Sequence, residues 1–176
     1  WAKGRVIRKI VQEELGGHPD PDIPHSISRS KAAVKRMQEL IRDLLNFAQL
    51  NKVQEWQDVD LEEVLQEVLQ DQGDAIQGSG AKITSEPLPH AMGDHGRFLQ
   101  LFHNLISNGI KYVAPGKQPE LRVSAAVGDS VTTLYFADRG IGIPEGKEET
   151  IFDMFERLHH RDDYPGTGIG LAITKR

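Results

Sequence analysis

Four short blocks in the C-terminal part of the chain constrain its fold more than any other feature. They follow one another as Asn104–Tyr112 (NLISNGIKY), Asp138–Ile143 (DRGIGI), Phe152–Arg157 (FDMFER) and Gly166–Ala172 (GTGIGLA). A single glycine-rich loop is weak evidence for any function, because glycine serves many kinds of turn. Four blocks that can each contact a nucleotide predict a site assembled from separate segments of one domain.

The composition fits a globular protein. The 176 residues are 38% hydrophobic and 27% charged, which suits one domain or a smaller domain with a helical appendage. No apolar run approaches the ~20 residues of a membrane helix, so we expect no membrane segment in this chain. The absence of cysteine excludes disulfides and fits a cytoplasmic location. A net charge of −5 argues against nucleic acid as a partner.

Two helices are expected at the start of the chain. Residues 5–15 carry an apolar stripe, and the glycine- and proline-rich segment 16–24 ends it. A second helix is expected from about residue 26 to residue 51, where apolar side chains recur every seven residues at Ile27, Val34, Ile41 and Ala48. This heptad spacing is typical of coiled coils and helix bundles. We therefore expect residues 1–53 to form a helical hairpin that makes a homodimer; packing on its own domain is the alternative.

The pattern after residue 53 mixes strands and helices. Period-two alternation indicates strands at residues 56–59, 81–85, 120–127 and 131–137. Asp60 and Asp94 can each cap a helix with an apolar stripe. This order predicts an α+β sandwich over residues 54–176, with one mixed sheet and helices on one face.

Three polar residues share one face of the helix that is expected after Asp94. Asn104, Asn108 and Lys111 are spaced i, i+4 and i+7. The amide oxygen of Asn108 suits Mg²⁺, and the ammonium group of Lys111 can pair with a phosphate. The spacing alone would fit a solvated helix face, but the other three blocks favour a binding face. Tyr112 can either contact the nucleotide or pack against the protein.

The second block places a carboxylate at the end of a predicted strand. The carboxylate of Asp138 can accept a hydrogen bond from the adenine amino group, which guanine lacks at that position. Gly140 and Gly142 let the backbone approach the base and ribose, and Ile143 completes the block. An ordinary Asp-Arg-Gly turn would explain this block if it stood alone.

The last block begins a predicted helix that continues through Ile173 to at least Arg176, where the chain stops within it. Backbone N–H groups at a helix N-terminus can bind phosphate, so we expect nucleotide contacts from Gly166, Thr167, Gly168, Gly170 and Leu171. The spacing matches neither a dinucleotide fold nor a P-loop.

A charged segment lies between Pro144 and Pro165 and contains Phe152 and Phe155. Its position between two nucleotide-contacting blocks is typical of a mobile lid with aromatic anchors. The alternative is a surface loop with two core phenylalanines.

In this order the blocks resemble the N, G1, F and G2 boxes of sensor histidine kinases. The run from Phe155 to Gly170 is particularly similar to phytochrome-type members, and residues 36–47 look like the second helix of a kinase dimerisation domain. The resemblance implies a Bergerat-type ATP-binding fold, Mg-ATP as ligand, and a response regulator receiver domain as partner. It also implies that Asn108 and Lys111 act in catalysis, with Asn108 as the metal ligand.

One position in this superfamily separates kinases from ATPases. The ATPases carry a glutamate as general base four residues before the metal-binding asparagine, and that position here is Asn104. They also tend to have aspartate at the position of Lys111. Both differences favour phosphoryl transfer to histidine over hydrolysis.

The resemblance also implies a phosphoacceptor histidine, followed by an acidic residue and, five positions on, by a proline. None of the seven histidines fits; His160 precedes Pro165 correctly, but Arg161 replaces the acid. We therefore expect the acceptor a few residues before Trp1. Two other functions stay open, a dimerising ATP-binding pseudokinase and, with less support, an ATPase.

Overall fold

The computed structural model describes residues 26–31, 33–34, 37–38, 41, 56–129, 131–154, 156, 158, 164 and 167–175. The chain divides into two units, residues 1–42 and 43–176, and each is described by itself. Within the described ranges, no helix combines the length and the apolar character needed to cross a lipid bilayer.

The described residues of the first unit are helical, as predicted for the start of the second helix. Three apolar side chains spaced seven residues apart face solvent, with exposed fractions of 40% for Ile27, 49% for Val34 and 59% for Ile41. An apolar stripe of this kind stabilises a helix only when another surface covers it. The predicted first helix, the loop at 16–24 and Ala48 lie outside the described residues.

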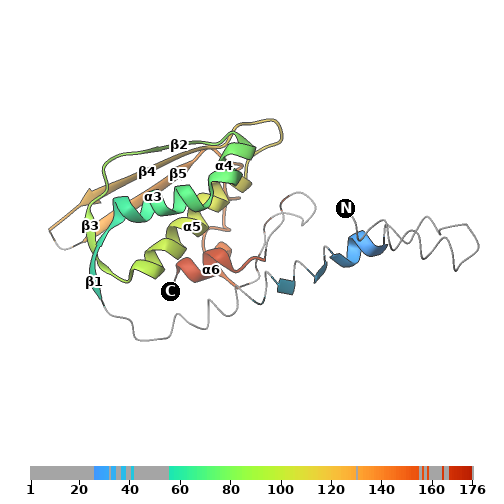
Figure 1. The fold of residues 1–176 in the computed structure, drawn as a ribbon, viewed down its shortest axis with the longest axis horizontal. Helices are drawn as coiled ribbons and strands as arrows, with labels where there is room; N and C mark the ends of the chain where they lie inside the picture. The colour runs from blue at the N-terminus through green and yellow to red at the C-terminus, as the bar shows by residue number, and fades with distance from the viewer. Residues whose placement is uncertain are drawn as a thin grey trace, which may run out of the picture. The chain divides into compact units, whose positions relative to one another are not determined.

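The described strands of the second unit form two hydrogen-bonded sheets, one of two strands and one of three (Figure 1). Strand β1 (Gln57–Asp60) pairs antiparallel with β3 (His90–Gly93). Strand β2 (Lys82–Ser85) runs parallel to β4 (Glu120–Val127), which pairs antiparallel with β5 (Thr132–Asp138). The mixed β2–β4–β5 sheet confirms the α+β class. Strand β3 escaped prediction because its four residues lack a clear apolar alternation.

Helices α3 (Leu61–Asp71), α4 (Gly73–Ser79) and α5 (His95–Lys111) cover one face of the β2–β4–β5 sheet (Figure 1). Both predicted caps are confirmed. The Asp60 carboxylate accepts a hydrogen bond from the Glu62 amide at 2.8 Å, and that of Asp94 accepts one from the Arg97 amide at 2.9 Å. Helix α4 was not predicted, because two of its seven residues are glycine, a poor helix former.

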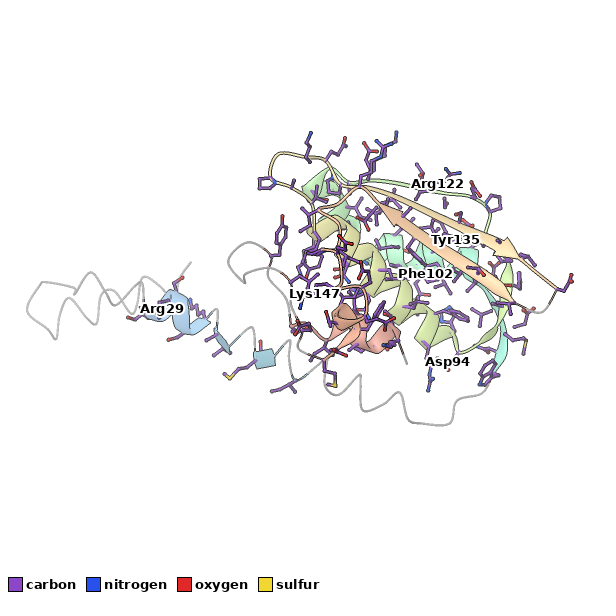
Figure 2. All side chains as sticks on the ribbon, turned by 180° about the vertical axis from the view of Figure 1, so that it is seen from behind. Arg29, Asp94, Phe102, Arg122, Tyr135 and Lys147 are labelled. Carbon is purple, nitrogen blue, oxygen red and sulfur yellow. The ribbon has the colours of Figure 1, made fainter. Side chains whose placement is uncertain are left out.

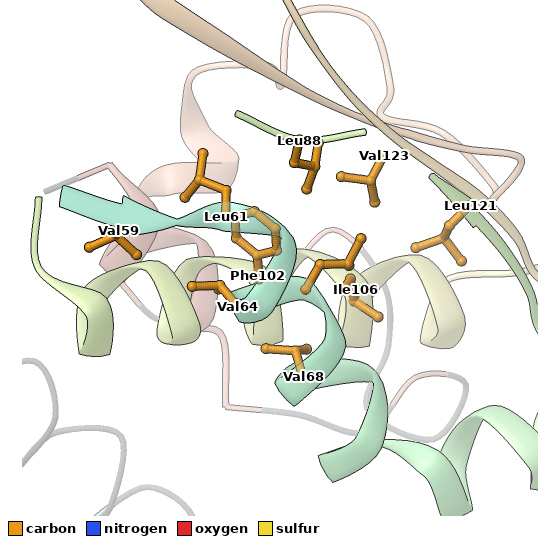
Figure 3. Close-up of a cluster of buried hydrophobic side chains, with 10 residues drawn as sticks. Val59, Leu61, Val64, Val68, Leu88, Phe102, Ile106, Leu121 and Val123 are labelled. Atoms are coloured by element: carbon orange, nitrogen blue, oxygen red, sulfur yellow. The ribbon is translucent and has the colours of Figure 1, made fainter. Parts of the chain in front are cut away.

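The hydrophobic core lies between α3, α5 and β4 (Figure 3). Its members include Leu61, Val64, Leu65 and Val68 of α3, Phe102 and Ile106 of α5, and Leu121 and Val123 of β4. Phe102 is fully buried, and its ring meets Phe136 edge-on with centroids 4.9 Å apart. Figure 2 shows Phe102 inside the domain and Asp94 at the start of α5. This packing fixes which side of α5 faces away from the sheet.

Candidate nucleotide-binding site

Helix α5 turns the three predicted polar residues away from the core. Phe102, Ile106 and Gly109 are buried on the core side of the helix. Each of the three polar residues follows one of these buried residues by two positions, which corresponds to a rotation of about 200° around the helix axis. Asn104, Asn108 and Lys111 are all half-buried. The predicted shared face is therefore present, and it lies opposite the core-facing residues.

Asn104 joins this face to the last glycine block. Its Nδ2 donates a hydrogen bond to the Gly170 carbonyl at 3.1 Å, across 66 residues of sequence. Gly170 begins helix α6 (Gly170–Thr174), which buries Ala172 and Ile173. The helix ends at Thr174 rather than continuing to Arg176 as predicted; the Thr174 hydroxyl donates to the Leu171 carbonyl. The first and last blocks are thus in direct contact.

The side chain of Asn108 is available to a ligand. This side chain makes no hydrogen bond to another described residue. In the described part of the chain, every fully buried side-chain nitrogen and oxygen has a hydrogen-bond partner, so the Asn108 amide is not fully buried. Its amide must therefore reach solvent. In the same part of the chain, no group of three or more histidine or acidic residues could hold a metal ion. A cation held by Asn108 would need most of its ligands from a bound molecule and water.

Tyr112 connects the end of α5 to the second block. Its carbonyl accepts a hydrogen bond from the Ile141 amide at 2.9 Å. Its hydroxyl accepts one from Lys111 Nζ at 2.8 Å, and this ammonium group lies 4.1 Å from the centre of the ring. Of the two predicted alternatives, the structure shows Tyr112 packed within the protein. A contact with nucleotide stays a prediction.

Asp138 is the last residue of β5 and is exposed. Its Oδ1 accepts a hydrogen bond from the Gly140 amide at 2.8 Å, whereas Oδ2 has no partner among the described residues. A Cβ atom on Gly140 would lie 2.4 Å from the Tyr112 carbonyl oxygen, so this position requires glycine. Gly142 has a φ of 74°, in the left-handed region that glycine tolerates. Beside it Ile143 is 50% exposed.

The remaining predicted site residues are described in part. Thr167, Gly168 and Leu171 are half-buried, and Gly168 has a φ of 76°. Of the predicted lid between Pro144 and Pro165, residues 155, 157, 159–163 and 165 lie outside the described residues, as does Gly166, so the lid stays a prediction. The predicted lid segment contains the short 3₁₀ helix η1 (Thr150–Phe152). The ammonium group of Lys175, which directly follows α6, lies 5.6 Å from the centre of the Phe152 ring, and this contact links η1 to the end of α6.

Sequence analysis missed one residue that joins this cluster. The Tyr164 hydroxyl donates a hydrogen bond to the Val113 carbonyl at 3.1 Å, and its ring centroid lies 5.3 Å from that of Tyr112. The only sign of this role in the sequence is that an aromatic residue stands just before the glycine block. That position does not indicate that Tyr164 contacts Val113 and Tyr112.

The assembled groups have the chemistry that an adenine nucleotide requires. Asn108 offers an amide oxygen for a hard cation, Lys111 offers a positive charge for phosphate, and Asp138 Oδ2 offers an acceptor for an amino group. Asn108 and Lys111 lie on the same side of α5. Asp138 lies three residues before Ile141, whose amide bonds to the Tyr112 carbonyl at the C-terminal end of α5. The donor set of the described residues therefore fits Mg-ATP.

A family model described as histidine kinase-, DNA gyrase B- and HSP90-like ATPase matches residues 93–176. The phytochrome-like protein Cph1 of Synechocystis sp. is 37% identical over 158 residues, covering 89% of this chain and 21% of the relative. The chain spans about a fifth of the length of the curated relatives it matches.

Two solved structures, ShkA and the histidine kinase ThkA, share the fold at low sequence identity. ShkA, in complex with AMPPNP, superposes with a TM-score of 0.67 at 24% identity, covering 90% of this chain and 34% of that chain. ThkA, in complex with response regulator protein TrrA, gives a TM-score of 0.64 at 19% identity, covering 89% of this chain and 47% of that chain.

Proposed function

We propose that this chain is the core of an ATP-dependent protein-histidine kinase of a two-component system. Residues 93–176 match the family of histidine kinase-, DNA gyrase B- and HSP90-like ATPases, and the curated relatives include proteins that are named histidine kinases. One observation carries the proposal. Asn104 bonds to Gly170, and Tyr112 bonds to Ile141, so that three blocks distant in sequence meet beside one face of α5.

Each group has a role in this proposal. The Asn108 amide oxygen holds Mg²⁺, which neutralises phosphate charge when bound, and Lys111 pairs with a phosphate oxygen. Asp138 Oδ2 accepts a hydrogen bond from the adenine amino group, because Oδ1 is already engaged by Gly140. The remaining proposed nucleotide contacts are Asn104, Tyr112, Gly140, Gly142, Ile143, Gly166, Thr167, Gly168, Gly170 and Leu171.

The residue at position 104 favours phosphoryl transfer over hydrolysis. An asparagine amide cannot accept the proton of an attacking water, and the Nδ2 of Asn104 is committed to the Gly170 carbonyl. We therefore propose that the γ-phosphate passes to a protein histidine and then to an aspartate of a response regulator. The complex of ThkA with a response regulator supports this choice of partner.

The first unit supports the proposed homodimer. Ile27, Val34 and Ile41 present an exposed apolar seam with heptad spacing, which a second copy would cover. In this proposal residues 1–53 are the helical hairpin of a dimerisation region and residues 54–176 are the catalytic ATP-binding domain. A cytoplasmic location is proposed because the chain has no cysteine and its partner is a signalling protein.

Calorimetric titration with Mg-ATP tests the site. Asp138→Asn should lower the affinity for Mg-ATP about tenfold or more and narrow the preference for ATP over GTP, since it replaces a charged acceptor. Asn108→Asp should also change the affinity and its dependence on Mg²⁺. Asp129→Asn in the β4–β5 turn and Gln70→Glu on an exposed side of α3 are the matched controls. Unchanged affinity in both site variants would refute the proposal.

A dimerising pseudokinase is the second candidate, because none of the seven histidines lies in an acceptor motif. The protein expressed from its complete gene can be incubated with ATP that is labelled at the γ-phosphate. Acid-labile, alkali-stable label on the protein supports the kinase. Binding of Mg-ATP without any label supports the pseudokinase, and release of inorganic phosphate would instead favour an ATPase.

A further inference from the structure

Tyr164 contributes the side chain that ties the segment before the last glycine block to the end of α5. Its hydroxyl donates a hydrogen bond to the Val113 carbonyl at 3.1 Å, and this bond spans 51 residues of sequence. Its ring packs against that of Tyr112, with centroids 5.3 Å apart and planes inclined by 40°. Two separate contacts therefore fix the orientation of Tyr164 on this surface.

Tyr112 in turn holds the lysine that is proposed to bind phosphate. The Lys111 ammonium group lies 2.8 Å from the Tyr112 hydroxyl and 4.1 Å from the centre of its ring. A lysine side chain has four rotatable bonds, so holding its ammonium group in one place costs rotamer entropy. The two contacts with Tyr112 restrict the Lys111 side chain before any ligand binds, so less rotamer entropy is lost on binding.

The backbone of Tyr112 is fixed independently of Tyr164. Its amide donates to the Asn108 carbonyl at 2.9 Å, and its carbonyl accepts from the Ile141 amide at 2.9 Å. The ring is held through its side-chain contacts, which include the ring of Tyr164 and the ammonium group of Lys111. Removal of Tyr164 should therefore loosen the Tyr112 ring, and with it Lys111, while leaving the path of the chain at residue 112 unchanged.

We propose that Tyr164 is a positioning residue for phosphate binding, acting through the Tyr112 ring to pre-orient the ammonium group of Lys111. This inference rests on the proposed function and assigns to it a residue that itself touches neither phosphate nor adenine. If it holds, Tyr164 increases the affinity for nucleotide only when Lys111 is present, and only for ligands that carry phosphates.

A double-mutant cycle tests this dependence. Tyr164→Leu should lower the affinity for Mg-ATP about fivefold, the size of effect expected for coupled neighbours. Its effect on adenosine, followed by NMR titration, should stay below about twofold because no phosphate is present. In a Lys111→Met background, the same Tyr164→Leu substitution should no longer change the affinity for Mg-ATP. Tyr164→Phe keeps the ring and should retain most of the wild-type affinity.

A measurement without nucleotide checks the ring contact itself. Tyr164→Leu should reduce the near-ultraviolet circular dichroism of tyrosine in the ligand-free protein by more than Tyr135→Leu does, because both substitutions remove one tyrosine but only the first removes a neighbour of the Tyr112 ring. Equal reductions would overturn the proposed role of this ring contact. Tyr135→Leu is the matched control, since Tyr135 is 51% exposed on β5 and should leave the affinity for Mg-ATP unchanged.

The outcomes separate this inference from the function it rests on. Equal losses for adenosine and Mg-ATP, or an undiminished effect of Tyr164→Leu in the Lys111→Met background, would overturn the role of Tyr164 alone. Failure of the wild-type chain to bind Mg-ATP would overturn the proposed function and this inference together.

Discussion

Helix α5 has two long faces that differ in what surrounds them. On one face, Phe102 and Ile106 are fully buried against the sheet and α3. On the other, Asn104, Asn108 and Lys111 remain partly open, and the side chain of Asn108 makes no hydrogen bond to another described residue. The first face contributes apolar burial to stability, whereas the second holds polar groups, of which Asn104 also bonds to Gly170 of α6. Under the proposed function, one helix therefore carries the core contacts and the proposed ligand site on separate faces.

The largest effect on stability is expected from truncating the core face. Phe102→Ala should lower the free energy of unfolding by about 3–5 kcal/mol, because it leaves a cavity where the Phe102 ring now packs against Phe136. Urea denaturation followed by circular dichroism measures the loss. Tyr135→Ala removes an exposed aromatic ring from the same domain and should cost much less. Equal losses would mean that burial does not distinguish these positions.

A smaller loss is expected where α5 approaches the sheet most closely. A Cβ atom at Gly109 would lie 2.3 Å from Leu121 Cδ2, so Gly109→Ala should lower the free energy of unfolding by about 1–3 kcal/mol. Leu121→Val in the same chain should recover part of this loss by making room.

The control for this substitution is Gly78→Ala in helix α4, where nothing lies within 4 Å of the added atom. There the usual preference of helices for alanine should stabilise the protein by about 0.5–1 kcal/mol. Thermal unfolding of both variants measures the contrast, and a stabilising Gly109→Ala would refute the close approach of α5 to β4.

The N-cap residue Asp94 stabilises the first turn of α5 and lies on neither of the two long faces. Asp94→Ala removes the acceptor for the Arg97 amide and should cost about 1 kcal/mol. Asp94→Asn keeps an acceptor oxygen and should lose only part of that stability. Urea denaturation of the two variants distinguishes a capping role from a charge effect, and equal losses would favour charge.

The smallest effect on stability is expected on the open face. Asn108→Ala should change the free energy of unfolding by no more than about 0.5 kcal/mol, because it breaks no side-chain hydrogen bond to a described residue. The same variant should lose measurable affinity for Mg-ATP in calorimetry. A large loss of stability would show that the open face is part of the fold.

The sequence predicted the elements that depend on local chemistry. Asp60 and Asp94 cap α3 and α5 because their carboxylates reach amides two or three residues ahead. The turn around Asp129 joins two strands that pair from Leu121 opposite Asp138 to Val127 opposite Thr132. Strand β3 and helix α4 were missed, because their formation depends on neighbouring elements more than on their own residues.

For the candidate site, the sequence by itself determined which groups are present and that Asn104, Asn108 and Lys111 share a helix face, since the helical repeat fixes that spacing. Only the tertiary structure decided which segments meet. The bonds from Asn104 to Gly170 and from Tyr164 to Val113 span 66 and 51 residues, and packing between distant elements, which no local pattern encodes, brings their ends together.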